Sequence, residues 1–203
     1  MVNKIPTYLD NPIDTQIYKH IDKYLPLLNK YNVTPNHLTA ISLLFGLSTS
    51  YFLYYDSYLL AGLTWFIAYY FDCADGKMAR AYDMVTQFGD YFDHGSDTLK
   101  CIIILYVIYL KLKGKKMTKL LILIFVLLAI NIMLVASHFG CQEKVSRDIR
   151  QVEINDAESL AMTEGFIITD CYTQMGYTKY VGSGTLVLFS SLLLVFWDKI
   201  VPK

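Results

Sequence analysis

Four aspartates form two closely spaced pairs within residues 72–97. Asp72 and Asp75 are three residues apart, and Asp93 and Asp97 are four residues apart. Since residues at these spacings share one face of a helix, each pair presents both carboxylates to the same side. A short turn separates the pairs, so the two helices should pack antiparallel. We therefore expect the four carboxylates to converge near one end of a helix pair.

Carboxylates gathered in this way need positive charge nearby. An ionised carboxylate near hydrocarbon costs at least about 3 kcal/mol, and four unpaired ones side by side cannot all remain charged. Two divalent cations would balance the four negative charges. Carboxylate oxygens suit hard ions, and no cluster of histidines or cysteines in the sequence favours a softer metal. The pattern therefore predicts two Mg²⁺ or Mn²⁺ ions held by these aspartates.

Two glycines and an arginine beside the aspartates indicate a phosphate-containing substrate. Gly76 directly follows Asp75, and Gly89 lies one turn before Asp93. Without side chains, these positions let a bulky ligand approach the backbone or let the helices close up. Arg80 adds a forked cation that suits a phosphate. Two metal ions can clamp a diphosphate and stabilise charge on a leaving phosphate.

Two other interpretations of the acidic cluster remain open on these residues alone. Carboxylates inside a membrane can form a path for protons or cations, as in a transporter. They can also form a salt-bridge cluster at helix ends, although the sequence places few cations nearby. The spacing of the whole segment separates these interpretations.

The segment 72–97 resembles the signature of the CDP-alcohol phosphotransferase (CDP-alcohol phosphatidyltransferase) family, D-x2-D-G-x2-A-R-x8-G-x3-D-x3-D. The stretch Thr34-Pro35-Asn36, a typical helix start with proline in its first turn, also resembles the segment by which the family enters its first span. The resemblance is strict over 72–97 and loose over 34–112. Every specified position of the signature matches: Asp72, Asp75, Gly76, Ala79, Arg80, Gly89, Asp93 and Asp97.

The resemblance implies a reaction and a role for each matched residue. A hydroxyl of the acceptor alcohol would attack the β-phosphorus of a CDP-alcohol, and CMP would leave. Asp97 would act as the catalytic general base and also contact a metal ion. The metal ligands would be Asp72, Asp75, Asp93 and Asp97, and the nucleotide and diphosphate would contact Gly76, Ala79, Arg80, Gly89 and Asn36.

The two alcohols are less well defined. Lys77, in Asp-Gly-Lys-x-Ala-Arg, and the stretch 92–97, Phe-Asp-His-Gly-x-Asp, resemble the branch that joins CDP-choline or CDP-ethanolamine to diacylglycerol. The length of 203 residues is more typical of CDP-diacylglycerol-dependent synthases of phosphatidylinositol, phosphatidylserine or phosphatidylglycerol phosphate. A phosphorylated acceptor would need a basic pocket, which Lys144, Arg147 and Arg150 could supply. We favour the first branch and keep the second as the alternative.

Lys100 lies about one turn beyond Asp97. From there its ammonium could contact a substrate phosphate or balance a carboxylate. The sequence gives these two interpretations equal weight.

Long apolar blocks predict the elements that carry these residues. Hydrophobic residues make up 54% of the chain, and a helix needs about 20 mostly apolar residues to cross a bilayer. We predict an all-α integral membrane protein with a bundle of five to six transmembrane helices. His138, at the end of the fourth span, is expected at the membrane interface. The predicted spans are 38–55, 58–71 with a helical continuation to 80, 88–112, 117–136 and 180–197, and the segment 157–168 is the doubtful sixth.

A helix is also predicted before the first span. Ile13, Ile17, Ile21, Leu25 and Leu28 recur at helical spacing among charged residues. This pattern is typical of an amphipathic helix at a membrane interface, or of one packed on the bundle. We therefore divide the chain into an N-terminal amphipathic juxtamembrane segment, 1–33, and a transmembrane CDP-alcohol phosphotransferase domain, 34–203.

Cysteine spacing and net charge exclude other kinds of protein. No two of Cys73, Cys101, Cys141 and Cys171 form a CxxC pair, so we expect isolated buried thiols and no disulfide scaffold or zinc site. The formal net charge is zero, which argues against a nucleic acid as partner.

The distribution of lysine and arginine favours a cytoplasmic N-terminus and an active site that faces the cytoplasm. The lysines of 111–119 oppose this orientation, because they would lie on the other side. Either the endoplasmic reticulum or the plasma membrane fits. A homodimer is expected from the family resemblance alone.

Overall fold

The computed structural model describes residues 5–113, 119–150 and 170–201, and within them it contains helices and no strands. This confirms the all-α prediction for the described part of the chain. The doubtful span 157–168 lies outside the described residues. The helices are α1 Pro12–Lys30, α2 Pro35–Tyr54, α3 Tyr58–Ala81, α4 Gln87–Leu112, α5 Lys119–Arg150, α6 Cys171–Thr178, the 3₁₀ helix η3 Lys179–Val181, α7 Ser183–Val195 and α8 Trp197–Ile200.

Side-chain caps fix where the helices around the acidic segment begin. Thr34 and His37 form a reciprocal capping box at the start of α2, and Pro35 occupies its first turn. Thr86 caps α4 by accepting a hydrogen bond from the backbone N–H of Gly89. The start predicted at Thr34-Pro35-Asn36 is therefore confirmed.

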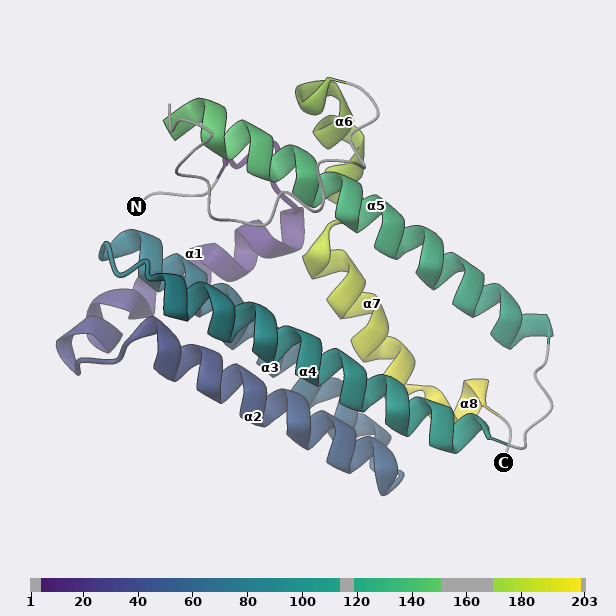
Figure 1. Cartoon of the computed structure of the whole chain (residues 1–203). Coiled ribbons are helices and arrows are strands. Elements are labelled where there is room, and N and C mark those ends of the chain that lie inside the picture. The colour runs from purple at the N-terminus through teal and green to yellow at the C-terminus, as the bar shows by residue number, and fades with distance from the viewer. Residues whose placement is uncertain (1–4, 114–118, 151–169, 202–203) are drawn as a thin grey trace.

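Helices α2, α3 and α4 run in alternating directions, and α3 and α4 carry the signature segment (Figure 1). Helix α2 packs along both α3 and α4, and α7 packs on another side of α3. Helices α3 and α4 themselves approach each other at few points. The prediction that they pack directly together was therefore wrong. The helix α2 bridges them, and all four aspartates line one cavity together with apolar side chains.

The predicted N-terminal helix is α1, and its apolar stripe packs on the protein. Ile17, Ile21 and Leu25 are buried against residues of α3 that include Ala74 and Met78. Of the two interpretations, the structure shows the helix packed on the bundle. A position of α1 at the membrane interface stays a prediction.

Buried polar contacts tie the start of α1 to α7. The Nδ2 of Asn11 donates to the carbonyl of Lys179 at 2.5 Å and to Thr185 Oγ1 at 2.9 Å. Asp14 accepts hydrogen bonds from Tyr69 at 2.6 Å and from Ser183 at 3.1 Å. Burial raises the pKa of Asp14 above its usual value, against the effect of these donors.

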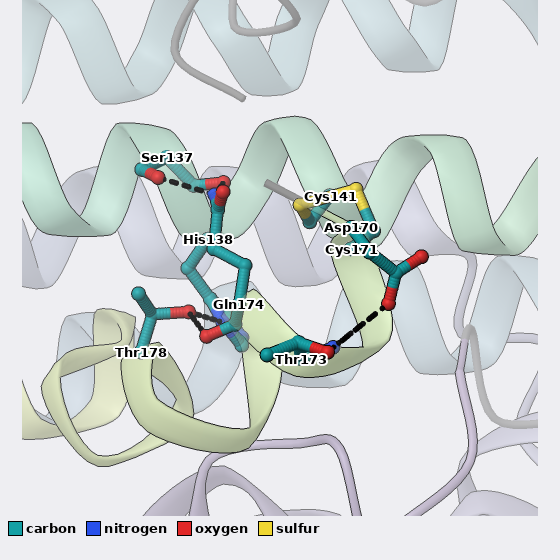
Figure 2. Close-up of a disulfide and its surroundings, with 8 residues drawn as sticks. All are labelled: Ser137, His138, Cys141, Asp170, Cys171, Thr173, Gln174 and Thr178. Atoms are coloured by element: carbon teal, nitrogen blue, oxygen red, sulfur yellow. Dashed lines mark hydrogen bonds between the residues drawn. A yellow bond between two sulfur atoms is a disulfide. The ribbon is translucent and has the colours of Figure 1, made fainter. Parts of the chain in front are cut away.

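A disulfide between Cys141 of α5 and Cys171 of α6 contradicts the prediction of isolated thiols (Figure 2). The two cysteines are 30 residues apart in the sequence, and their Cα atoms are 5.0 Å apart. Only the packing of α6 on α5 brings them together, so their spacing gave no indication of the bond. Of the other two, Cys73 is buried and Cys101 is exposed, and both are free thiols.

His138 is buried beside this disulfide (Figure 2). Its Nδ1 is hydrogen-bonded to Thr178 Oγ1 at 3.0 Å, and Gln174 of α6 donates to the Ser137 carbonyl at 3.2 Å. Helix α6 covers His138, so its side chain contacts protein, and its level relative to the membrane interface stays a prediction.

Among the described residues, two stretches have the length and hydropathy that a membrane crossing requires. They are Phe125–Gln142 within α5 and Cys171–Val195 over α6 to α7. The full number of spans stays a prediction.

Candidate active site

Three of the four aspartates meet across the space between α3 and α4. Asp72 of α3 and Asp93 and Asp97 of α4 each offer a carboxylate oxygen, and these oxygens all lie within 4.8 Å of one another. One turn of helix separates Asp93 from Asp97, so both reach the same point. The predicted convergence therefore holds for three of the four side chains.

Asp75 lies beside this group but outside it. Its side chain is buried, and its Oδ2 accepts a hydrogen bond of 2.6 Å from the hydroxyl of Thr39 on α2. It lines the same two cavities as Asp93. The Thr39 contact was missed from the sequence, because nothing near Asp75 in the chain indicates that α2 packs there.

A cavity of about 220 Å³ opens next to the acids, between the start of α2, the end of α3 and the start of α4. Asp75 and Asp93 form one side of it. All of the residues predicted to contact the nucleotide line this cavity: Asn36, Gly76, Ala79, Arg80 and Gly89.

Gly76 and Gly89 leave room for polar side chains in the walls of this cavity. A Cβ on Gly76 would lie 3.2 Å from a terminal nitrogen of Arg80, and one on Gly89 would lie 3.2 Å from Asn36 Oδ1. The Nε of Arg80 is buried, with no hydrogen-bond partner among the described residues. A buried guanidinium N–H that lacks a partner beside a cavity suits an anionic ligand.

A second cavity, of about 410 Å³, adjoins the first and shares Asp75, Gly76, Arg80 and Asp93 with it. Asp72, Asp97 and Lys100 line it together with residues of α5 and α7, among them Gln142 and Ser183. Sequence reasoning missed the last two. In the sequence, Gln142 and Ser183 stand out only as polar residues within apolar stretches. Many buried positions without a function have the same pattern.

A third cavity, of about 250 Å³, adjoins the second, and its lining is almost wholly apolar. The two cavities share the side chains of Trp65, Cys101, Leu186 and Val187. A polar site and an apolar space therefore adjoin within the same group of helices.

Lys100 balances the acids. Its Nζ lies 2.6 Å from Asp97 Oδ1 and 3.0 Å from Asp72 Oδ1, and its side chain is 5% exposed. Of the two interpretations, contact with a substrate phosphate or balance of a carboxylate, the structure shows the second.

Lys77, which lies within the signature segment, has a structural contact that the sequence did not indicate. Lys77 is buried, lies 3.1 Å from Asp22 of α1 and sits over the ring of Tyr18. It links α1 to α3 and lines neither cavity beside the acids.

Comparison with known proteins identifies the family to which this arrangement belongs. The sequence profile for CDP-alcohol phosphatidyltransferases matches residues 32–197, most of the chain. The chain belongs to the CDP-alcohol phosphatidyltransferase family.

Individual relatives of this chain match shorter stretches. An archaetidylinositol phosphate synthase from Pyrococcus horikoshii is 34% identical over 110 residues, which is 54% of this chain and 54% of that protein. An uncharacterised protein from Aquifex aeolicus is 41% identical over 76 residues, or 36% of this chain and 38% of that protein. Human ethanolaminephosphotransferase 1 is 36% identical over 52 residues, or 26% of this chain and 13% of that protein. The chain thus matches about half of the first relative's length and less of the others.

The donor atoms of the acidic group fit a hard divalent ion. Asp72, Asp93 and Asp97 offer only carboxylate oxygens, which Mg²⁺ and Mn²⁺ prefer. The Oδ1 of Asp93 is buried with no hydrogen-bond partner among the described residues, and a cation would satisfy it. Asp75 is close enough to line the same space.

The basic pocket considered for a phosphorylated acceptor is not assembled by the described side chains. Lys144 is exposed and lines none of the cavities beside the acids. The side chains of Arg147 and Arg150 lie outside the described part of the chain.

Proposed function

We propose that this protein is a multi-pass membrane enzyme that transfers a substituted phosphate group from a CDP-alcohol to an acceptor alcohol and releases CMP. One observation carries the proposal. The carboxylates of Asp72, Asp93 and Asp97 meet beside two adjoining cavities, one lined by the remaining signature residues and the other also by residues of other helices. Two substrates could thus reach the same acids from two adjoining cavities.

The first cavity would hold the cytidine diphosphate part of the donor. Arg80 would bind a phosphate oxygen through its unpartnered Nε, and Gly76, Ala79, Gly89 and Asn36 would form the walls. Asp72, Asp75, Asp93 and Asp97 would hold two Mg²⁺ or Mn²⁺ ions. Such ions would neutralise the diphosphate and the charge that develops on departing CMP.

Asp97 would act as the general base. Its side chain is 47% exposed and lines the second cavity, where an acceptor hydroxyl would lie. As the hydroxyl oxygen bonds to the β-phosphorus, the phosphorus–oxygen bond to CMP breaks and Asp97 receives the hydroxyl proton. An alkyl hydroxyl is a weak nucleophile at neutral pH, so a base at this position is required.

We favour CDP-choline or CDP-ethanolamine as donor and diacylglycerol as acceptor. The apolar cavity next to the second one offers space for hydrocarbon, and the short match to human ethanolaminephosphotransferase 1 supports the same choice. The match to an archaetidylinositol phosphate synthase favours the alternative, a CDP-diacylglycerol-dependent synthase of phosphatidylinositol, phosphatidylserine or phosphatidylglycerol phosphate.

Exposed apolar side chains support a position within a bilayer. Leu44, Leu59, Ile102, Leu105 and Ile132 are each at least half exposed and lie on four different helices. Apolar surface spread over several helices is typical of contact with lipid. We propose five to six spans, a cytoplasmic active site and, from the family resemblance, a homodimer.

A substrate panel tests the proposal. The purified full chain in detergent is incubated with CDP-choline, CDP-ethanolamine or CDP-diacylglycerol, with and without Mg²⁺ or Mn²⁺, and with an acceptor of each class. We expect CMP to appear only when metal and a matching acceptor are both present. The donor that yields CMP distinguishes the two branches.

A cation or proton transporter is the proposal's rival from another class of protein. A transporter would give carboxylate-dependent ion flux in liposomes and no binding of CDP-alcohols. Binding of a CDP-alcohol that is lost in Arg80→Ala would support the transferase, because an ion path has no need for a guanidinium beside a glycine-walled cavity.

A further inference from the structure

Lys100 occupies a site that three helices build around it. Its ammonium contacts Asp97 on its own helix α4, Asp72 on α3 and Ser42 on α2, the last at 2.8 Å between Nζ and Oγ. An ammonium has three N–H donors, so all three have acceptors. Lys100 therefore has no free donor for a substrate phosphate.

The aliphatic stem of Lys100 also packs closely, against Gly46 of α2. A Cβ on Gly46 of α2 would lie 2.5 Å from Cγ and 2.5 Å from Cδ of Lys100. Gly46 lies one helical turn from Ser42, so the same face of α2 supplies both the space for the stem and a partner for the ammonium. Any larger residue at position 46 would displace the lysine.

Two of the three Lys100 contacts are with members of the acidic group that fits a metal ion. The ammonium binds the Oδ1 atoms of Asp72 and Asp97, and the group consists of Asp72, Asp93 and Asp97. A divalent cation that used these carboxylates would share their oxygens with Lys100 and would be repelled by its charge. Without a metal ion, the ammonium would limit repulsion among the acids.

We propose that Lys100 is a positioning residue that acts as a built-in counter-cation of the metal site. It keeps Asp72 and Asp97 together in the metal-free protein and lowers the affinity for divalent ions. The metal site would therefore fill and empty within a range of ion concentration that Lys100 sets. This inference rests on the proposed function, because it requires that the acids hold metal.

The test compares Lys100→Met with the wild-type full chain in detergent. Methionine keeps an unbranched stem for the space at Gly46 and removes the charge. Mn²⁺ binding is measured from the free-ion signal in electron paramagnetic resonance, and thermal unfolding is measured with and without Mn²⁺. We expect Lys100→Met to bind Mn²⁺ about tenfold more tightly, as loss of a close like charge would allow, and to unfold at a lower temperature without metal.

Lys77→Met is the matched control. Lys77 is also a buried lysine paired with an aspartate, Asp22, but it lines neither cavity beside the acids. We expect this variant to unfold at a lower temperature with an unchanged Mn²⁺ affinity. Lys100→Arg keeps the charge and should bind Mn²⁺ within about threefold of the wild type.

The outcomes separate the two proposals. Wild-type protein that binds no Mn²⁺ would contradict the metal site itself. Wild-type protein that binds Mn²⁺, with equal or weaker binding by Lys100→Met, would overturn the role of Lys100 alone. If Lys100→Met does not fold, Lys100→Gln gives the same comparison, because it also lacks the charge and keeps a polar end for Ser42.

Discussion

The four carboxylates of the signature differ in the groups that each one contacts. Asp75 accepts from Thr39, Asp72 and Asp97 accept from Lys100, and Asp93 has a buried oxygen without a partner among the described residues. Four chemically identical side chains thus have different surroundings. In the proposed mechanism, these differences would allow Asp97 to serve as the base although all four carboxylates take part in holding metal.

Asp97→Asn should abolish turnover and leave nucleotide binding in place. Asparagine keeps the shape of the side chain but cannot take the acceptor's proton, so we expect CMP release to fall at least about 100-fold. Binding of the CDP-alcohol is measured by calorimetry and should change little, because Asp97 does not line the nucleotide cavity.

Asp83→Asn is the control for this substitution. Asp83 is exposed in the turn between α3 and α4 with a φ of 55°, a conformation that asparagine also adopts. It should retain full activity. An Asp97→Asn enzyme that releases CMP at the wild-type rate would remove the base assignment.

The buried Asp10 should make stability depend on pH. Burial raises the pKa of this carboxyl from 3.8 to about 6, so between these values the folded protein binds a proton that the unfolded chain has lost. Stability from this group therefore falls as pH rises through that window. Asp10→Asn removes the free-energy cost of burying an ionised carboxylate. We therefore expect it to stabilise the protein at pH 7 by about 2–3 kcal/mol.

Thermal unfolding of the wild type and of Asp10→Asn between pH 4 and pH 7 measures this effect. The difference in stability between the two proteins should be small at pH 4, grow as pH rises and level off above pH 6. Asp148→Asn, at an exposed position of α5, should follow the wild type. A stabilisation by Asp10→Asn that is constant over the whole range would show that ionisation is not its cause.

At the scale of helices, local patterns predicted local structure. The spacing of Ile17, Ile21 and Leu25 predicted the buried face of α1, and Thr34-Pro35 predicted the start of α2. The signature residues are close in sequence, so their spacing along α3 and α4 was enough to place four predicted contacts, Gly76, Ala79, Arg80 and Gly89, around one cavity.

Contacts between distant segments could not be predicted in the same way. The pairs Thr39–Asp75, Asp22–Lys77 and Cys141–Cys171 each join residues on different helices, and none follows from periodicity. The position of Lys100 depends on two small residues of α2: Gly46 leaves space for its stem, and Ser42 accepts a hydrogen bond from its Nζ. Neither contact can be predicted without knowing that α2 packs on α4.

The bond between α5 and α6 can be tested by counting thiols. Denatured protein that has not been reduced should label with maleimide at Cys73 and Cys101, and reduced protein should label at all four cysteines. Mass spectrometry of the labelled peptides identifies the sites. Labelling of Cys141 and Cys171 without reduction would contradict the bond.

At the scale of the whole molecule, the disulfide bears on the orientation in the membrane. Cys141 and Cys171 pack with Ile5 and Leu9, so they lie on the side of the N-terminal segment. Reducing cytoplasm keeps most thiols free, with intracellular proteins of hyperthermophiles as an exception. If the N-terminal segment and the active site face the cytoplasm, as proposed, this bond lies where it would normally be reduced.

Labelling in intact cells decides the orientation. A cysteine introduced at Asp83, in the turn beside the active site, should resist a membrane-impermeant maleimide if that turn faces the cytoplasm. Labelling before lysis would reverse the proposed orientation and would put the disulfide in an oxidising compartment. The protein carries the exposed Cys101, so the measurement is made in a Cys101→Ser background.

The central claim is that carboxylates from α3 and α4 share metal ions. Anomalous X-ray scattering from crystals grown with Mn²⁺ locates such ions directly. The account predicts two peaks at about 2.2 Å from carboxylate oxygens, contributed by Asp72, Asp75, Asp93 and Asp97. Mn²⁺ bound elsewhere, with no peak within coordination distance of these four side chains, would contradict it.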